Sequence, residues 1–278
     1  MNRQSGLLTI LMIPSSVASA IGSVANMSLP VFIYNLEDLV AGKHSEIPTG
    51  NVVLDGAEGR HAVSVKRMTA GEQIKLIDGR GGWATATVAS TSGKSTLNLQ
   101  VFECNEEATP TPTVTVFQAI PKSERSELAV DLLTQGGADA IVPWEAHRCV
   151  AKWVGAKRSK GVLKWQQAAI AAAKQSRRTR IPEIAEPMTT AQIAEQLEQF
   201  DVVLVLHEDA AVPFATVDVS TAKSIALIIG PEGGVSPDEA EAFRKAGARA
   251  VKLGPEVLRT ASAGIVALAA LGVQTSRW

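Results

Sequence analysis

The stretch Leu227-Ile228-Ile229-Gly230-Pro231-Glu232-Gly233-Gly234-Val235-Ser236-Pro237-Asp238-Glu239 combines an apolar strand, a glycine-rich turn and the start of a helix. Its apolar run is typical of a strand that is covered on both faces. Ser236 can cap the helix, Pro237 suits the first helical position, and Glu239 completes a capping box. Three glycines in five residues allow the backbone to approach a ligand closely. The stretch therefore predicts an α/β fold with a ligand-binding turn at the end of a strand, and a structural turn with an exposed Glu232 is the alternative.

A second turn of this kind lies in Lys252-Leu253-Gly254-Pro255-Glu256-Val257-Leu258-Arg259-Thr260, after the last predicted strand. The predicted helix that follows, 260–271, is almost entirely small and apolar. A helix that is apolar all round must be buried, in a tight core or against a second subunit.

Strands and helices alternate from residue 114 to the C-terminus. The predicted strands are 114–120, 140–143, 202–206, 225–229 and 250–253, and the predicted helices are 123–135, 162–176, 190–200, 236–246 and 260–271. Apolar strands that alternate with helices indicate a mostly parallel sheet covered on both faces. Ligands on such sheets bind at the carboxyl ends of the strands.

The N-terminal part has a different pattern, with short strands separated by glycine-containing turns. We predict strands at 52–54, 73–77, 83–88 and 96–102, and one helix near 58–68. This pattern favours a small β-barrel domain. Residues 105–112, rich in Glu, Thr and Pro, indicate a linker. The chain is therefore expected to contain two domains, 27–107 and 108–278.

The first 26 residues fit neither domain. One charge, Arg3, precedes the apolar run 7–13 and a series of small residues, a pattern shared with signal peptides. No apolar run reaches the roughly 20 residues of a membrane span. We favour an extension, disordered or mis-assigned, before a globular protein that begins at Met27, because the motifs below need a cytoplasmic cosubstrate. A secreted, shortened product in a cell fractionation would contradict this interpretation.

The composition of the 278-residue chain is that of a globular protein, with 46% hydrophobic and 20% charged residues. It excludes a disordered or fibrous chain. The two cysteines, Cys104 and Cys149, are far apart and form no C-x-x-C, which argues against a disulfide scaffold or a cysteine zinc site. The four histidines have no metal-ligand spacing. No metal site is expected.

The formal net charge of −1 hides an uneven distribution. Between Glu145 and Glu183 there are ten basic residues and no acidic one. Phosphates attract Lys and Arg and release counterions on binding, so this pattern favours nucleic acid over its alternative, a solvated helix face with a basic loop. Arg177, Arg178 and Arg180 follow the predicted helix 162–176, where cations suit the helix dipole and can still bind phosphate.

Three motifs, in this order, resemble those of the bacterial 16S ribosomal RNA uridine-N3 methyltransferase family, which belongs to the knotted SPOUT methyltransferases. They are Gln175-Ser176-x-Arg178-x-x-x-Pro182, then Ile229 to Gly234, then Leu253-Gly254-x-x-Val257-Leu258-Arg259-Thr260. The resemblance covers roughly Met27 to the C-terminus and implies an α/β knotted SPOUT domain preceded by a small PUA-like β-barrel. This chain departs from the family at Ala261, where an acidic residue is usual, and at Arg177, where glycine is common.

The resemblance implies an enzyme that uses S-adenosyl-L-methionine to methylate uridine N3 in the 16S ribosomal RNA of the small subunit. It also implies a cytoplasmic homodimer with no metal and no membrane. The turns 229–234 and 253–260 would line the cofactor pocket. The cofactor-binding residues expected from the resemblance are Leu206, Ile229, Gly230, Pro231, Gly233, Gly234, Leu253, Gly254, Val257, Leu258 and Thr260.

Uridine N3 is a poor nucleophile until its proton leaves, so catalysis needs a base and stabilisation of the resulting anion. We expect Arg178 to stabilise the uracil anion or its phosphate, and Glu232 to orient the substrate or accept the proton. Arg259 would hold the turn. Two alternatives stay open: a related enzyme that acts on tRNA, and a non-catalytic RNA-binding factor of ribosome assembly. The expected RNA-binding residues are His61, Lys66, Arg67, Lys152, Lys174, Arg177 and Arg180.

Overall fold

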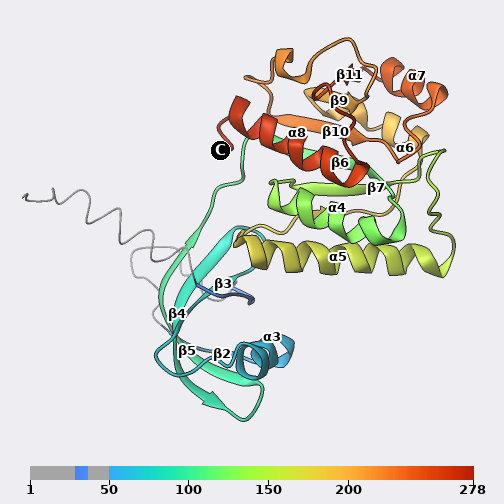
Figure 1. The fold of residues 1–278 in the computed structure, drawn as a ribbon. Coiled ribbons are helices and arrows are strands. Elements are labelled where there is room, and N and C mark those ends of the chain that lie inside the picture. The colour runs from blue at the N-terminus through green and yellow to red at the C-terminus, as the bar shows by residue number, and fades with distance from the viewer. Residues whose placement is uncertain (1–28, 37–49) are drawn as a thin grey trace, which may run out of the picture.

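The structure is a computed structural model that describes residues 29–36 and 50–278, without the side chains of residues 123 and 124. It contains two β-sheets, a smaller one built from the first strands of the chain and a larger one built from the rest (Figure 1). The predicted extension at residues 1–26 lies outside the described residues.

The larger sheet has the strand order β11-β9-β10-β6-β7-β8, and all of its strand pairs are parallel. The strand order reverses between β10 and β6, and this is where open α/β sheets bind ligands, at the carboxyl ends of the strands. The predicted parallel sheet is confirmed. Its strands are β6 (Thr113–Ala119), β7 (Ala140–Trp144), β8 (Glu183–Ile184), β9 (Val202–Leu206), β10 (Ser224–Ile229) and β11 (Arg249–Val251).

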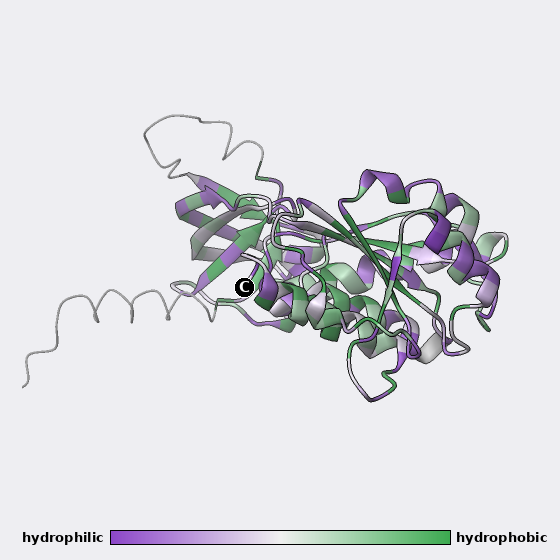
Figure 2. Ribbon diagram, turned by 90° about the horizontal axis from the view of Figure 1, so that it is seen from above, coloured by the Kyte–Doolittle hydropathy of each residue, from purple (hydrophilic) through white to green (hydrophobic). Residues whose placement is uncertain are grey.

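Helices cover both faces of this sheet. One face packs against α4 (Ser123–Gln135), α5 (Ala156–Ser176) and α8 (Thr260–Gln274) (Figure 1). The other face packs against α6 (Thr190–Ala194), the 3-10 turn η3 (Leu197–Gln199) and α7 (Pro237–Lys245). Figure 2 shows the hydrophobic strands of the sheet lying between the helical layers. Burial on both faces explains why these strands have continuous apolar runs.

Several element boundaries differ from the prediction. Helix α5 begins at Ala156 and not at the predicted 162. The prediction missed the first turns of α5 because their lysines and arginine hide the apolar periodicity. The predicted helix 190–200 is divided into α6 and η3. Strand β11 ends at Val251, because Lys252 instead pairs with Pro213 before the 3-10 turn η4 (Phe214–Thr216).

The smaller sheet has the order β1-β3-β4-β5-β2, with β1 parallel to β3 and the other pairs antiparallel. Strand β1 was not predicted. Strand β5 extends through Glu106, so the linker is shorter than the predicted 105–112. The elements are β1 (Val31–Ile33), β2 (Asn51–Leu54), α3 (Gly56–Arg60), the π-helix η2 (His61–Val65), β3 (Gln73–Ile77), β4 (Gly82–Ser92) and β5 (Thr96–Glu106).

The end of α5 and the residues after it contact the smaller sheet. The Lys174 Nζ lies 2.7 and 2.8 Å from the two carboxylate oxygens of Glu58 on α3. The Thr179 hydroxyl donates to the Glu107 carboxylate at 2.6 Å, and the Arg180 guanidinium donates to the Glu107 carbonyl at 2.6 Å. These contacts, one ion pair and two hydrogen bonds, form a polar seam between the two sheets.

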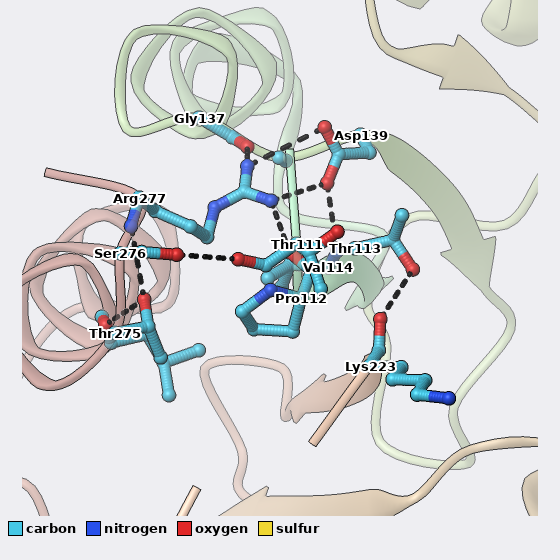
Figure 3. Close-up of polar contacts among 12 residues, drawn as sticks. Thr111, Pro112, Thr113, Val114, Gly137, Asp139, Lys223, Thr275, Ser276 and Arg277 are labelled. Carbon is cyan, nitrogen blue, oxygen red and sulfur yellow. Dashed lines mark hydrogen bonds and ion pairs between the residues drawn. The ribbon is translucent and has the colours of Figure 1, made fainter. Parts of the chain in front are cut away.

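An ion pair between Arg277 and Asp139 holds the C-terminal segment against the amino ends of β6 and β7. The Arg277 guanidinium donates to Asp139 Oδ2 at 2.9 Å and to the carbonyls of Pro112 and Gly137 (Figure 3). The Val114 amide donates to the same Oδ2 at 2.8 Å. Because Arg277 follows α8 directly and is almost buried, this cluster holds one end of α8 against the sheet.

Candidate active site

A pocket of about 520 Å³ lies at the carboxyl ends of β9, β10 and β11. Its walls are the three segments that follow these strands, 206–209, 229–235 and 251–260. The expectation that the two glycine-containing turns line one pocket is therefore met. All eleven predicted cofactor residues are among its lining: Leu206, Ile229, Gly230, Pro231, Gly233, Gly234, Leu253, Gly254, Val257, Leu258 and Thr260.

A chain of buried hydrogen bonds fixes the two turns relative to each other. The Thr260 hydroxyl, at the start of α8, donates to the Gly230 carbonyl at 2.6 Å. It accepts a hydrogen bond from Gln118 Nε2, on β6, at 3.1 Å. At Gly230, a Cβ would lie 2.9 Å from Val235 Cγ2, so the turn is closed too tightly for a side chain there. The geometry explains why glycine stands at 230 and why Thr260 is buried.

Behind the glycine turn, the buried Glu239 joins three elements. Its carboxylate accepts hydrogen bonds from the His147 amide at 2.8 Å, the Thr190 hydroxyl at 3.0 Å and the Ser236 hydroxyl at 2.7 Å. The predicted capping box between Ser236 and Glu239 is confirmed. The same carboxylate thus caps α7 and also holds the segment after β7 and the start of α6 against the turn.

Glu239 should make the stability of the protein depend on pH in the acid range. Burial alone would raise the pKa of Glu239, but hydrogen bonds from His147, Ser236 and Thr190 outweigh burial and lower it. A carboxyl with a lowered folded-state pKa contributes stability that is present above its unfolded pKa and lost as the pH falls through the folded pKa. Between about pH 6 and pH 3, the Tm of the wild type should therefore fall more steeply than the Tm of Glu239→Gln.

Thermal unfolding followed by circular dichroism at several pH values checks this prediction. Asp238→Asn is the matched control, since Asp238 is an exposed carboxylate in the same helical turn. The control should keep the wild-type pH dependence. Parallel curves for the wild type and Glu239→Gln would rule out the role given to this carboxylate.

Glu232 lies at the mouth of the pocket and is exposed. Its Oε1 accepts a hydrogen bond from the Lys122 amide, just before α4, at 3.1 Å. This contact directs the carboxylate toward the space between the glycine turn and the carboxyl end of β6. The predicted position of Glu232, exposed at the end of a strand, agrees with the structure.

The charged side chains of the pocket are unevenly distributed. Arg125 and Arg148 follow β6 and β7, on one side of the glycine turn. The acidic residues of the other side follow β9 and β11, where basic residues also occur. The charged lining on that second side is Glu208, Asp209, Lys252, Glu256 and Arg259. Neither Arg125 nor Arg148 is among the site residues predicted from the sequence, although both come shortly after predicted strands.

Arg178 is not part of this pocket. Its Nη1 donates to the carbonyls of Thr134 at 2.6 Å and Ala138 at 3.0 Å, and its Nη2 lies 3.9 Å from Asp139. Burial lowers the pKa of Arg178, and the nearby Asp139 carboxylate partly opposes this effect. These partners lie at the amino ends of β6 and β7, whereas the pocket lies at the carboxyl ends of the strands. Within this chain, the expected catalytic position of Arg178 is therefore replaced by a structural one.

The expected RNA-binding residues lie in several different environments. Lys174 and Arg180 contact Glu58 and the Glu107 carbonyl in the seam between the sheets. The Lys152 ammonium is exposed and donates to the Ala146 carbonyl at 3.1 Å. Arg177 ends α5 with a φ of 63°, a left-handed conformation that glycine adopts at lower cost. The remaining three, His61, Lys66 and Arg67, belong to the smaller sheet's helical segment and the turn after it.

In the part of the chain that the structure describes, no group of three or more His, Cys, Asp or Glu side chains is placed to hold a metal ion. None of the described helices has the length and apolarity that crossing a membrane requires. Both cysteines are free thiols, with Cys149 buried and Cys104 half-buried.

Comparison with known proteins identifies the family. A family model described as an RNA methyltransferase domain matches residues 107–272, and one described as an RNA methyltransferase PUA domain matches residues 54–102. The chain belongs to this RNA methyltransferase family.

Relatives of this RNA methyltransferase carry the name ribosomal RNA small subunit methyltransferase E. The protein of that name from Mycobacterium bovis is 47% identical over 235 residues, which cover 83% of this chain and 89% of the relative. The Bacillus subtilis protein of that name is 30% identical over 246 residues, 86% of this chain and 95% of the relative. The family resemblance drawn from the three motifs is confirmed.

Solved structures show the same fold. A methyltransferase from Legionella pneumophila, in complex with its bound cofactor SAM, is 28% identical and superposes with a TM-score of 0.76, covering 89% of this chain and 98% of that one. A ribosomal RNA small subunit methyltransferase E from Neisseria gonorrhoeae, at 23% identity, has a TM-score of 0.75 over 88% of this chain and 97% of that one. The likeness extends over both sheets.

Proposed function

We propose that this RNA methyltransferase uses S-adenosyl-L-methionine to methylate N3 of a uridine in the 16S ribosomal RNA of the small subunit. The observation that carries the proposal is the single pocket into which the predicted turns at Gly230 and Gly254 both open. The names of the relatives support the substrate, and the bound SAM of the Legionella structure supports the cofactor.

The pocket suits this cofactor. Its volume of about 520 Å³ lies in the range of small-molecule sites. At Gly254 a Cβ would have the Glu256 carboxylate as its nearest neighbour, at 3.7 Å, so this part of the wall is open backbone. Leu253 and Val257 offer apolar surface to an adenine ring, while Glu208 and Asp209 can accept hydrogen bonds from hydroxyl and ammonium groups. The residues present fit the group in size, apolar surface and hydrogen-bonding capacity.

The cofactor supplies an electrophilic methyl group on a sulfonium centre. The chain must hold the uracil in line with that methyl and remove the N3 proton. We assign the second task, or the orientation of the N3–H, to Glu232. The Lys122 amide holds one carboxylate oxygen of Glu232 in place and leaves the other for the substrate. Arg178 takes no part in this scheme, because its side chain donates to the carbonyls of Thr134 and Ala138 at the amino ends of the strands.

We further propose a homodimer that forms on the exposed side of α8. This helix carries no charged residue over Thr260–Gln274, and Val266 and Val273 on its outer side are 42% and 78% exposed. Apolar stripes of this kind mark interaction sites. Helix α8 also returns from β11, at one edge of the sheet, to pack on α4, and this path supports a knotted C-terminal domain. The smaller sheet would act as a PUA-like barrel that binds RNA, and the enzyme would work in the cytoplasm, where ribosomal subunits are.

The test is transfer of labelled methyl groups to small ribosomal subunits from a strain that lacks this protein, with mass spectrometry of the 16S RNA. We expect 3-methyluridine with the wild type. With Glu232→Gln the rate of methyl transfer should fall by a factor of at least about 100, the size of effect that general bases have. Cofactor affinity measured by calorimetry should change little. Glu241→Gln, on the exposed side of α7, is the matched control.

Two results would contradict the proposal. Methylation of tRNA in place of 16S RNA would favour the related tRNA enzyme. A wild-type protein that binds ribosomal RNA but not S-adenosyl-L-methionine would favour a non-catalytic assembly factor.

A further inference from the structure

Two arginines at the mouth of the pocket, Arg125 and Arg148, are free to meet a ligand that is larger than the cofactor. We propose that they bind phosphates of the RNA backbone beside the target nucleotide and thereby hold its base over the pocket. The inference rests on the proposed function of the same pocket and names the residues that receive the RNA there.

Arg125 lies in the first turn of α4, immediately after β6, and lines the pocket. Its side chain is half-buried. Among the side chains and backbone groups that the structure describes, which leaves out the side chains of residues 123 and 124, none forms a hydrogen bond or ion pair with its guanidinium group. A half-buried arginine that no carboxylate neutralises keeps its full charge for an anionic ligand.

Arg148 lies in the segment after β7 and is held over the glycine turn. Its Nη1 donates to the Gly233 carbonyl at 3.0 Å, and its Cβ would lie 3.1 Å from a Cβ at Gly233. This packing explains the glycine at 233, since a side chain there would push Arg148 away. Only one of its five N–H donors is used in this contact, and the residue is exposed. The rest of the guanidinium group is therefore positioned and still available.

The two arginines belong together because β6 and β7 are neighbours in the sheet. Parallel neighbours lie about 4.8 Å apart, so residues that follow their carboxyl ends share one rim. On this rim Glu232 is the acidic residue of the pocket lining, whereas Glu208, Asp209 and Glu256 line the opposite side. Lys252 and Arg259 also line that opposite side. The carboxylates there lie where hydroxyl and ammonium groups of the cofactor would bind, and Arg125 and Arg148 lie where RNA would enter.

Phosphate is the ligand that this chemistry favours. Guanidinium groups bind phosphate oxygens through pairs of parallel hydrogen bonds, and each contact releases counterions from the nucleic acid. Arg125 and Arg148 also supply, at the pocket itself, the positive charge that was expected from Arg178. Arg125 and Arg148 would act as substrate-binding residues that place the base, while the proton chemistry stays with Glu232.

The salt dependence of RNA binding tests the inference independently of methyl transfer. Binding of the full chain to small ribosomal subunits, isolated from a strain that lacks this protein, is measured at several KCl concentrations. The plot of log K against log[KCl] has a negative slope. Arg125→Gln and Arg148→Gln should each make this slope less steep by about one unit. Arg148→Lys keeps the charge and should keep the wild-type slope. Arg244→Gln, an exposed arginine paired with Glu241 away from the pocket mouth, is the matched control and should also keep it.

Calorimetry with S-adenosyl-L-methionine shows in the same samples whether each variant retains an intact pocket. The KM for ribosomal subunits should rise about tenfold for Arg125→Gln, with a smaller change in kcat. A wild-type slope for Arg125→Gln and for Arg148→Gln would overturn the inference, whatever the activity. A wild type that transfers no methyl group would count against the proposed function, and the salt slopes would still decide the role of the two arginines.

Discussion

Asp139→Ala should lower the free energy of unfolding by about 3–5 kcal/mol, the cost of breaking a buried ion pair by removal of one partner. In the native protein, Asp139 Oδ2 lies 2.9 Å from the Arg277 guanidinium and accepts the Val114 amide at 2.8 Å (Figure 3). Arg178 lies 3.9 Å from the other oxygen. The substitution would leave two largely buried guanidinium groups without their carboxylate and one strand amide without its acceptor.

For a chain of this length, the Tm should fall by about 10 °C, measured by calorimetry or circular dichroism. Asp139→Asn keeps the shape and one acceptor oxygen but removes the charge, so its loss should be smaller. Glu241→Ala breaks an exposed pair on α7 and should change stability by less than about 1 kcal/mol. A Tm for Asp139→Ala within about 2 °C of the wild type would show that the cluster does not hold the C-terminus.

The sequence predicted well those features that rest on local signals. Helix α4 was predicted with its observed bounds, Ser123–Gln135, and the capping box of α7 is present with the expected partners. The two glycine-containing turns were also placed at the correct end of the sheet, because a glycine-rich turn after an apolar strand lies at the carboxyl end of a parallel strand. These inferences need only neighbouring residues and one general rule of topology. The individual cofactor residues were expected from the family resemblance.

Arg178 shows where the same rule should have been applied again. Helix α5 begins near the carboxyl edge, after β7, and its 21 residues extend over roughly 32 Å. A helix of that length, running back along the sheet, delivers its C-terminal residues to the amino edge, where Arg178 meets Thr134 and Ala138. By the same reasoning, Arg125 and Arg148, which follow strands directly, belong to the pocket edge. The direction of the chain, more than the type of residue, separates the two groups.

Other differences depend on contacts between distant residues, which no local pattern contains. In the sequence, Lys174 belongs to a cationic stretch, but in the structure the Glu58 carboxylate on α3 neutralises its charge. Arg180 donates a hydrogen bond to the Glu107 carbonyl. A run of basic residues in the sequence therefore overstates the cationic surface of the folded protein. The basic residues that line the pocket are Arg125 and Arg148, after β6 and β7, and Lys252 and Arg259, after β11.

Thr260→Val should weaken cofactor binding by about tenfold or more and destabilise the protein by about 1–3 kcal/mol, the cost of leaving buried polar groups without partners. Valine nearly matches threonine in volume but has no hydroxyl. The Gly230 carbonyl would lose a donor at 2.6 Å, and Gln118 Nε2 would lose an acceptor at 3.1 Å. Because this hydroxyl is the direct link between the turn after β10 and the start of α8, the two walls of the pocket would no longer be held at one separation.

Thr260→Ser separates this role from simple packing, since serine keeps the hydroxyl and loses only a methyl group. Its cofactor affinity, measured by calorimetry well below the Tm, should stay close to that of the wild type. If Thr260→Val bound S-adenosyl-L-methionine as tightly as the wild type while unfolding at a lower temperature, the hydroxyl would stabilise the fold without shaping the pocket. The expected order of affinity, wild type and Thr260→Ser above Thr260→Val, follows from the position of one buried oxygen atom between Gln118 and Gly230.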